Sequence, residues 1–422
     1  MYTKQVLKNG LTTIVSTMPH MESVSLGIWI GVGGRYESEK ESGLSHMIEH
    51  MLFKGTLTRT TRDLKENIEG IGGSLNGFTS DEATCYMVKV PSNYAEVGID
   101  VLSDMVLAPK FDEAEIEREK FVVVEEIKMY KDQPADHVHE LLAGIMWPKD
   151  PLGRLLTGTI TNVKSFTRQD MIKFREKNYI PSNMAIIAAG SIKPGLIENL
   201  AEKIFCGTSL RATPIKASTI DQKQHKTVFS NKNIQQTHIA IGFPFKEKDI
   251  SEKYPMELLN VILGGNMSSR LFEELREKNG LCYDIASNYK RHSDVSEFVI
   301  HAGVDTRKTV DAVSAVLSEL KKMKNFHVSD DELKRAKEFI KGQFRMALEN
   351  TSTRMLWMGD RFMMEKTIPD VEEILGKLDA VGKGDIKKAA CKIFRESFLN
   401  LAIIGKVESA VREKIKAEIA KL

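Results

Sequence analysis

The chain has 422 residues, of which 42% are apolar and 28% charged, as in an ordinary soluble protein of about two domains. Sixty lysines and arginines stand against 58 aspartates and glutamates, and a net charge of +2 lacks the basic excess that nucleic-acid-binding proteins usually show. No apolar run approaches the roughly 20 residues that a membrane span requires.

The opening residues and the cysteines both predict a cytoplasmic protein. Residues 6–16, VLKNGLTTIVS, read as two short strands around an Asn-Gly turn, so we expect neither a secretory nor an import signal there. The cysteines are far apart and form no C-x-x-C pair, which argues against a disulfide scaffold or a cysteine-bound zinc and suits a reducing compartment. They are Cys85, Cys206, Cys282 and Cys391.

The rest of the first half alternates strand and helix patterns. A β-branched and aromatic run at 23–34 predicts a strand, and residues 43–55, GLSHMIEHMLFKG, predict a helix. The following patterns predict a helix at 60–72, one or two strands at 73–91, two helices at 92–109 and 112–134, and a buried strand at 183–192.

The second half repeats this order, which predicts an internal duplication. The strand pattern at 237–245 corresponds to that at 23–34, the helical pattern at 254–265 to that at 43–55, and the strand pattern at 398–407 to that at 183–192. Between the halves lies a polar, non-periodic stretch. We therefore predict domains at 1–210 and 229–422 joined by a linker at 211–228. Each domain is expected to be α+β, a mainly antiparallel sheet with helices on one face.

The helix at 43–55 holds two histidines four residues apart. His46 and His50 therefore share a face, with Glu49 beside it. Two imidazoles so placed supply two of the three protein ligands of a catalytic zinc, and the acid can act as general base. The order H-x-x-E-H is itself a zinc-peptidase signature. Taken alone, the same residues also fit a helix with exposed or core histidines.

A third ligand is expected on the helix at 112–134. On a helical wheel Glu119 and Glu126 fall with Val123 and Tyr130, on the apolar face. A carboxylate there is costly unless it is paired or bound to a cation, so a metal accounts for both glutamates, Glu126 as ligand and Glu119 as a supporting acid. The alternative is that the apolar face is misassigned and both glutamates are solvated.

The combination of His46-x-x-Glu49-His50 with Glu126 resembles the inverzincin peptidases of the M16 family, which include pitrilysin and the mitochondrial processing peptidase. The stretches GLSHMIEHMLFKGT, GGSLNGFTS, E-x6-E and SRLFEELREKNGLCY resemble family blocks in family order, over essentially the whole chain, and its length is that of the bacterial two-domain members. The resemblance implies the metallohydrolase fold of the processing peptidase and one Zn²⁺ per chain. It also implies that His46, His50 and Glu126 bind the ion, with Glu49 as the general base and Glu119 as support.

The resemblance also implies three substrate-binding residues. Asn76 is expected to hold the substrate main chain, beside an edge strand that pairs with an extended peptide. Arg276 and Tyr283 match the Arg/Tyr pair that contacts substrate from the second half of family members. Without the resemblance, Arg276 fits a cation near a helix C-terminus and Tyr283 a strand core residue. The helix at 254–265 has no histidine, so only the first half is expected to bind metal.

The resemblance thus implies a zinc endopeptidase that cleaves extended peptides inside a chamber, with zinc-bound water activated by Glu49. A two-domain chain needs a second chain of similar size to close such a chamber, and a homodimer is the simplest. One rival function is a non-catalytic binding or assembly subunit of a processing-peptidase-like complex, against which the intact zinc motif argues. Another is a hydrolase of small molecules, against which Asn76, Arg276 and Tyr283 argue.

Overall fold

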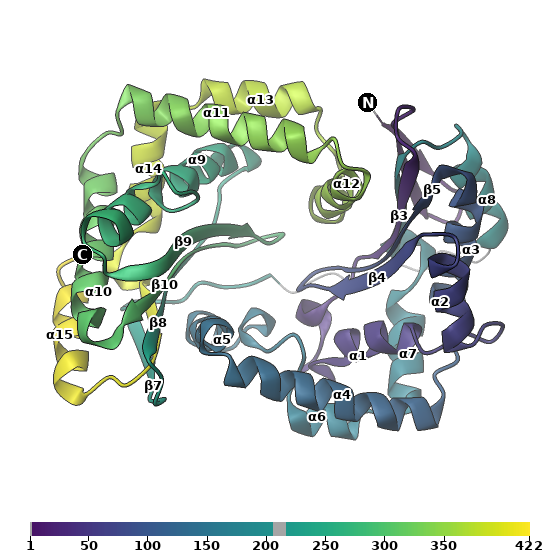
Figure 1. The fold of residues 1–422 in the computed structure, drawn as a ribbon, viewed down its shortest axis with the longest axis horizontal. Coiled ribbons are helices and arrows are strands. Elements are labelled where there is room, and N and C mark those ends of the chain that lie inside the picture. Colours follow the sequence, from purple (N-terminus) through teal and green to yellow (C-terminus); the bar gives the residue numbers. More distant parts are fainter. Residues whose placement is uncertain (1, 206–216) are drawn as a thin grey trace. The chain divides into compact units, whose positions relative to one another are not determined.

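The computed structural model describes residues 2–205 and 217–422 (Figure 1). The described strands form two sheets, and each sheet is the centre of a compact unit surrounded by helices. The first unit comprises residues 2–129, 154–205 and 345–368, and the second comprises 130–153, 217–344 and 369–422. This arrangement confirms the predicted α+β class.

The sheet of the first unit has the order β1-β2-β6-β3-β5-β4. Neighbours are antiparallel except β2 and β6, which run parallel, and β4 lies at an edge. The predicted Asn-Gly hairpin is present as β1 and β2, and residues 73–91 form two strands. The strands are β1 (Thr3–Val6), β2 (Thr12–Thr17), β3 (Ser23–Ile30), β4 (Ser74–Thr79), β5 (Thr84–Pro91) and β6 (Met184–Gly190).

Both faces of this sheet are covered by helices. Alternate residues of a strand point to opposite faces. Ile28 of β3 accordingly packs in the core shared with α1 and α3, whereas its neighbour Trp29 packs with Met355 of α12. The helices of the first unit are α1 (Leu44–Leu52), α2 (Thr61–Glu69), α3 (Ala95–Leu107), α4 (Glu113–Asp132, most of its length), α6 (Ile160–Ser165), α7 (Arg168–Asn178), α8 (Leu196–Ile204) and α12 (Thr351–Glu365).

The sheet of the second unit has the order β7-β11-β8-β10-β9. Only β7 and β11 run parallel among these pairs, and β9 lies at an edge. The strands are β7 (Lys226–Ser230), β8 (Gln236–Phe245), β9 (Cys282–Arg291), β10 (Ser296–Asp305) and β11 (Asn400–Ile404). Around them are α5 (Pro134–Met146), α9 (Lys253–Leu263), a π-helical turn (Phe272–Lys278), α10 (Thr309–Asn325), α11 (Asp330–Ala347, mostly in this unit), α13 (Val371–Ala380), α14 (Lys383–Ile393) and α15 (Ser409–Ile419).

Each unit takes one helix from the other half of the sequence. Helix α5 precedes the predicted linker, yet Leu142 and Met146 lie against Gly242 of the second sheet. Helix α12 follows the linker and packs on the first sheet. Each sheet was predicted to carry helices on one face. In the structure α12 covers the second face of the first sheet, and α5 covers the second face of the second sheet. The boundaries at 210 and 229 stay a prediction; β7 begins within the last residues of the predicted linker, and residues 206–216 lie outside the described part of the chain.

Two further expectations concern the described residues only. None of the helices in the described part of the chain is long and apolar enough to cross a membrane. Of the cysteines, Cys85 is buried, Cys282 half-buried and Cys391 exposed, and all three are free thiols. Cys206 lies outside the described residues.

Candidate metal centre

Helix α1 begins at a glycine because its first turn requires one. Gly43 has a φ of 96°, a left-handed conformation that favours glycine over other residues. The carboxylate of Glu37 accepts hydrogen bonds from the backbone N–H groups of Gly43 (2.8 Å) and Ser45 (2.6 Å), which have no partner within the helix. Burial raises the pKa of Glu37 to about 7, against the lowering effect of these two bonds. This cap anchors the turn that carries His46.

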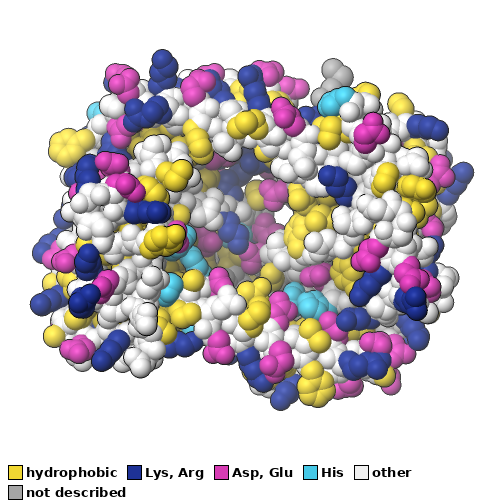
Figure 2. Space-filling view, viewed as in Figure 1, with side chains coloured by type: hydrophobic (Ala, Val, Ile, Leu, Met, Phe, Trp, Pro, Cys, Tyr) yellow, Lys and Arg dark blue, Asp and Glu magenta, His cyan; other side chains and the backbone are white. Residues whose placement is uncertain are grey.

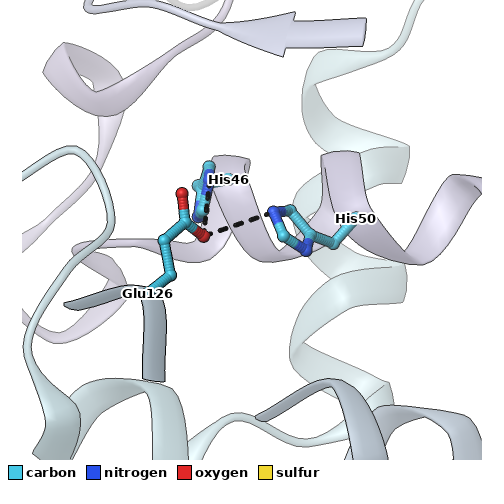
Figure 3. A group of neighbouring side chains, drawn as sticks. All are labelled: His46, His50 and Glu126. Atoms are coloured by element: carbon cyan, nitrogen blue, oxygen red, sulfur yellow. Dashed lines mark ion pairs between the residues drawn. The ribbon is translucent and has the colours of Figure 1, made fainter. Parts of the chain in front are cut away.

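His46, His50 and Glu126 meet at one point (Figure 3). The Oε2 atom of Glu126, on α4, lies 3.7 Å from Nε2 of His46 and 3.6 Å from Nε2 of His50. One ligand atom from each of the three lies within 4.8 Å of the other two. In the described ranges, 2–205 and 217–422, no other trio of His, Cys, Asp or Glu side chains has this property. The sequence prediction of these three residues as neighbours therefore matches their placement.

The arrangement of the three side chains is better suited to coordinating a divalent metal than to hydrogen bonding among themselves. Glu126 Oε2 is buried and has no hydrogen-bond partner, although two imidazole nitrogens face it. Separations of 3.6–3.7 Å are too long for hydrogen bonds but close to the spacing of atoms that share one cation. Burial raises the pKa of Glu126 and lowers that of His46 to about 4, so the imidazole of His46 is neutral near pH 7. Two imidazoles and a carboxylate are a donor set of catalytic zinc sites.

Glu119 contacts His50 from outside the group of His46, His50 and Glu126. Its side chain is only 5% exposed. Its Oε1 atom lies 2.9 Å from Nδ1 of His50, and its Oε2 atom lies 2.5 Å from the Lys54 ammonium. Burial opposes ionisation of Glu119, but the hydrogen bonds from His50 and Lys54 outweigh it and hold its pKa below the usual value. An ionised Glu119 accepts the Nδ1–H of His50, which leaves Nε2 free to bind a metal.

Glu49 lies beside His50, half-buried on α1. The hydroxyl of Thr79, the last residue of β4, donates a hydrogen bond to Glu49 Oε2 over 3.3 Å. Burial raises the pKa of Glu49, and the nearby His50 and the bond from Thr79 act in the opposite direction. A carboxylate with a raised pKa next to a metal site is suited to accept and return a proton.

Asn76 lies on the exposed edge strand β4, three residues before Thr79. Its Oδ1 atom accepts a hydrogen bond from the backbone of Gly77 over 2.8 Å. Among the described strands β4 pairs only with β5, so no described strand pairs with the backbone groups on its other edge.

Arg276 and Tyr283 lie together in the second unit. The guanidinium of Arg276 is 5.0 Å from the ring centroid of Tyr283 and 4.7 Å from that of Phe272. Tyr283 is 75% exposed on the edge strand β9, so the alternative of a strand core residue is wrong. Arg276 lies in the last turn of its helix, which agrees with the alternative interpretation of a cation near a helix C-terminus.

Three residues of the site were not found by sequence reasoning. Lys54 follows His50 by one helical turn, and this spacing could have indicated it. Thr79 lies in the same strand as Asn76 but carries no motif of its own. Glu37 precedes the helix by several residues, and only the turn between them brings its carboxylate to the helix end.

Two family models match this chain. Residues 12–160 match the family described as "Insulinase (Peptidase family M16)", and residues 165–340 match "Peptidase M16 inactive domain". His46, His50 and Glu126 all lie within the first match.

Relatives and solved structures match over nearly their full lengths. "Uncharacterized zinc protease YmxG" of Bacillus subtilis is 34% identical over 407 residues, 96% of this chain and 98% of the relative. An "Uncharacterized zinc protease" of Rickettsia felis is 34% identical over 94% of this chain and 96% of its own. The crystal structure of a protease from Helicobacter pylori has a TM-score of 0.88 at 21% identity, covering 96% of this chain and 99% of that one. The crystal structure of a peptidase M16 inactive domain from Pseudomonas fluorescens has a TM-score of 0.89 at 16% identity, covering 96% of this chain and 98% of that one. These two structures support the fold.

Proposed function

The chain belongs to peptidase family M16, and on this premise we propose that it is a zinc-dependent endopeptidase. The observation that carries the proposal is the buried, unpartnered carboxylate oxygen of Glu126 facing the Nε2 atoms of His46 and His50. That the similar proteins of Bacillus subtilis and Rickettsia felis are named zinc proteases supports zinc as the ion and peptides as the substrate class.

His46, His50 and Glu126 would hold the ion, and Zn²⁺ bound there would supply Lewis-acid chemistry that polarises the scissile carbonyl and acidifies water. The proton transfers then fall to Glu49. Its carboxylate takes the proton of the attacking water and returns it to the leaving amine nitrogen. The hydroxyl of Thr79 holds the Glu49 carboxylate in position for both steps.

The substrate is proposed to be an extended peptide. It would add to the sheet of the first unit along the free edge of β4, with Asn76 contacting its main chain. Arg276 and Tyr283 would add a cation and an exposed aromatic ring, both suited to contact peptide groups. We further propose that cleavage takes place inside a chamber closed by a homodimer, which analytical ultracentrifugation can test.

The direct test is Glu49→Gln. The variant should bind as much zinc as the wild type, because Glu49 is not among the proposed ligands, while turnover of a fluorogenic peptide falls by roughly 10²- to 10⁴-fold, the usual contribution of a general base. Glu66→Gln is the matched control, since the Glu66 side chain is 60% exposed on α2, and it should retain full activity. If Glu49→Gln kept most of the activity, the proposed mechanism would be wrong.

The rival function, a non-catalytic binding or assembly subunit, gives a different result in the same assay. It predicts that the wild-type protein binds zinc but cleaves nothing in a broad peptide library. Cleavage that disappears on treatment with a chelator and returns with Zn²⁺ would exclude it.

A further inference from the structure

Three histidines and an aspartate gather on the second sheet, on the face that carries α5. His238 lies on β8, His301 on β10, Asp284 on β9 and His139 on α5. All four belong to the second unit and lie far along the chain from the H-x-x-E-H helix. Figure 2 shows histidine side chains exposed over β9 and β10 (cyan).

The strand register places the side chains of His238, Asp284 and His301 on the same face of the sheet. Gly303 of β10 pairs with His238 on one side and with Asp284 on the other. His301 is two residues from Gly303, so it points to the same face. A methyl group at Gly303 would lie 3.8 Å from Cε1 and 3.9 Å from Nδ1 of the His238 ring. The Oε1 atom of Gln236 would lie nearer still, at 3.5 Å, so Gly303 separates His238 from Asp284 with no side chain of its own.

His301 is the centre of the cluster. Its Nε2 atom lies 3.1 Å from Asp284 Oδ2, and its ring centroid lies 5.4 Å from that of His139. The rings of His46 and His50 are separated by a similar 4.5 Å. When Nε2–H donates to a carboxylate, the Nδ1 of the same ring is left as an acceptor with increased basicity, the arrangement found in metal-binding histidines.

The histidines are suited to coordination at neutral pH. Burial and the neighbouring His301 both lower the pKa of His139 and of His238, while Asp136 and Asp284 act weakly in the opposite direction. Neutral imidazoles are the form that binds metals. Several imidazoles with a single carboxylate favour late first-row ions such as Cu²⁺, Ni²⁺ and Zn²⁺ over Mg²⁺ or Ca²⁺.

We propose that His139, His238 and His301 form a second transition-metal site, in which Asp284 orients His301. Among the described residues, only the group of His46, His50 and Glu126 already has its ligand atoms within 4.8 Å of one another. Binding at the second site therefore requires side-chain rotation, and the side chains of His301 and Asp284, 35% and 67% exposed, are free to turn on the solvent side. This reorganisation makes the second site weaker than the first.

The test measures metal binding and does not depend on proteolysis. The full chain carrying His46→Gln and His50→Gln, which lacks the first site, is titrated with Cu²⁺ and examined by electron paramagnetic resonance. We expect one bound Cu²⁺ per chain with hyperfine coupling to at least two imidazole nitrogens. Adding His301→Gln should weaken binding at least tenfold, whereas adding His327→Gln, an exposed histidine of the same unit, should not.

Two further measurements cover variants that fold poorly. Asp284 is exposed, so Asp284→Asn should fold normally and still weaken Cu²⁺ binding by about tenfold through loss of the carboxylate partner. In the chain with both sites intact, His301→Gln should reduce the zinc stoichiometry from two to one. The proposal is overturned if the chain without the first site binds no Cu²⁺, or if Asp284→Asn and His301→Gln bind as tightly as the His327 control.

Discussion

Replacement of Glu119 by glutamine tests how much a residue outside the ligand group contributes to metal affinity. The Glu119 carboxylate accepts one charge-assisted hydrogen bond from His50 Nδ1 (2.9 Å) and another from the Lys54 ammonium (2.5 Å). Glutamine has a single acceptor oxygen and no charge, so it can keep only one of these bonds. The other bond, of a kind that contributes about 1.5–3 kcal/mol, is lost in a side chain that is only 5% exposed.

That loss should appear as weaker zinc binding. A decrease of 10- to 100-fold in affinity is typical when the carboxylate partner of a ligating histidine is removed, and it corresponds to about 1.4–2.7 kcal/mol. The affinity is measured by competition with a chromophoric chelator, and circular dichroism checks that the variant is folded. Glu125→Gln is the matched control, because it lies on the same helix with a side chain 71% exposed. Equal zinc affinity of the Glu119 and Glu125 variants would refute the role assigned to Glu119.

Two other predictions concern stability. A methyl group at Gly359 would lie 2.0–2.4 Å from three atoms of the buried Trp29 ring, so Gly359→Ala should destabilise the chain by about 1–3 kcal/mol in urea denaturation, whereas the control Gly376→Ala, with open space around it, should not. The pKa of Glu37, about 7 when folded and near 4.3 when unfolded, means that the folded state binds more protons between these values. The stability of the wild type relative to Glu37→Gln should therefore fall as the pH rises from about 5 to about 8, and a difference independent of pH would contradict the buried carboxyl.

Local patterns were sufficient to predict most of the elements that position the site. The alternation in residues 73–91 predicted β4 and β5, and the apolar spacing at 60–72 predicted α2. The wheel of the helix at 112–134 placed Glu119 on its buried face, where the structure has it only 4% exposed. Period and spacing are properties of neighbouring residues, so they can be read without a fold.

Sequence patterns did not reveal which faces the helices would cover. Nothing in the residues of α5 or α12 indicates that each packs on the sheet of the other half. That choice depends on how two apolar sheet faces are covered once the whole chain has folded. The contact of Thr79 with Glu49 and the cap provided by Glu37 likewise arise from turns and strand order.

The sequence by itself thus determined the chemistry available to this protein: two histidines and a base on one helix face, and an acid on the buried face of another helix. Only the tertiary structure decided that Glu126 Oε2 lies within 3.7 Å of both imidazoles, and that His238, His301 and Asp284 gather around Gly303. The physical reason is that helical spacing is local, whereas contacts between distant segments depend on strand register and on the packing of helices against sheets.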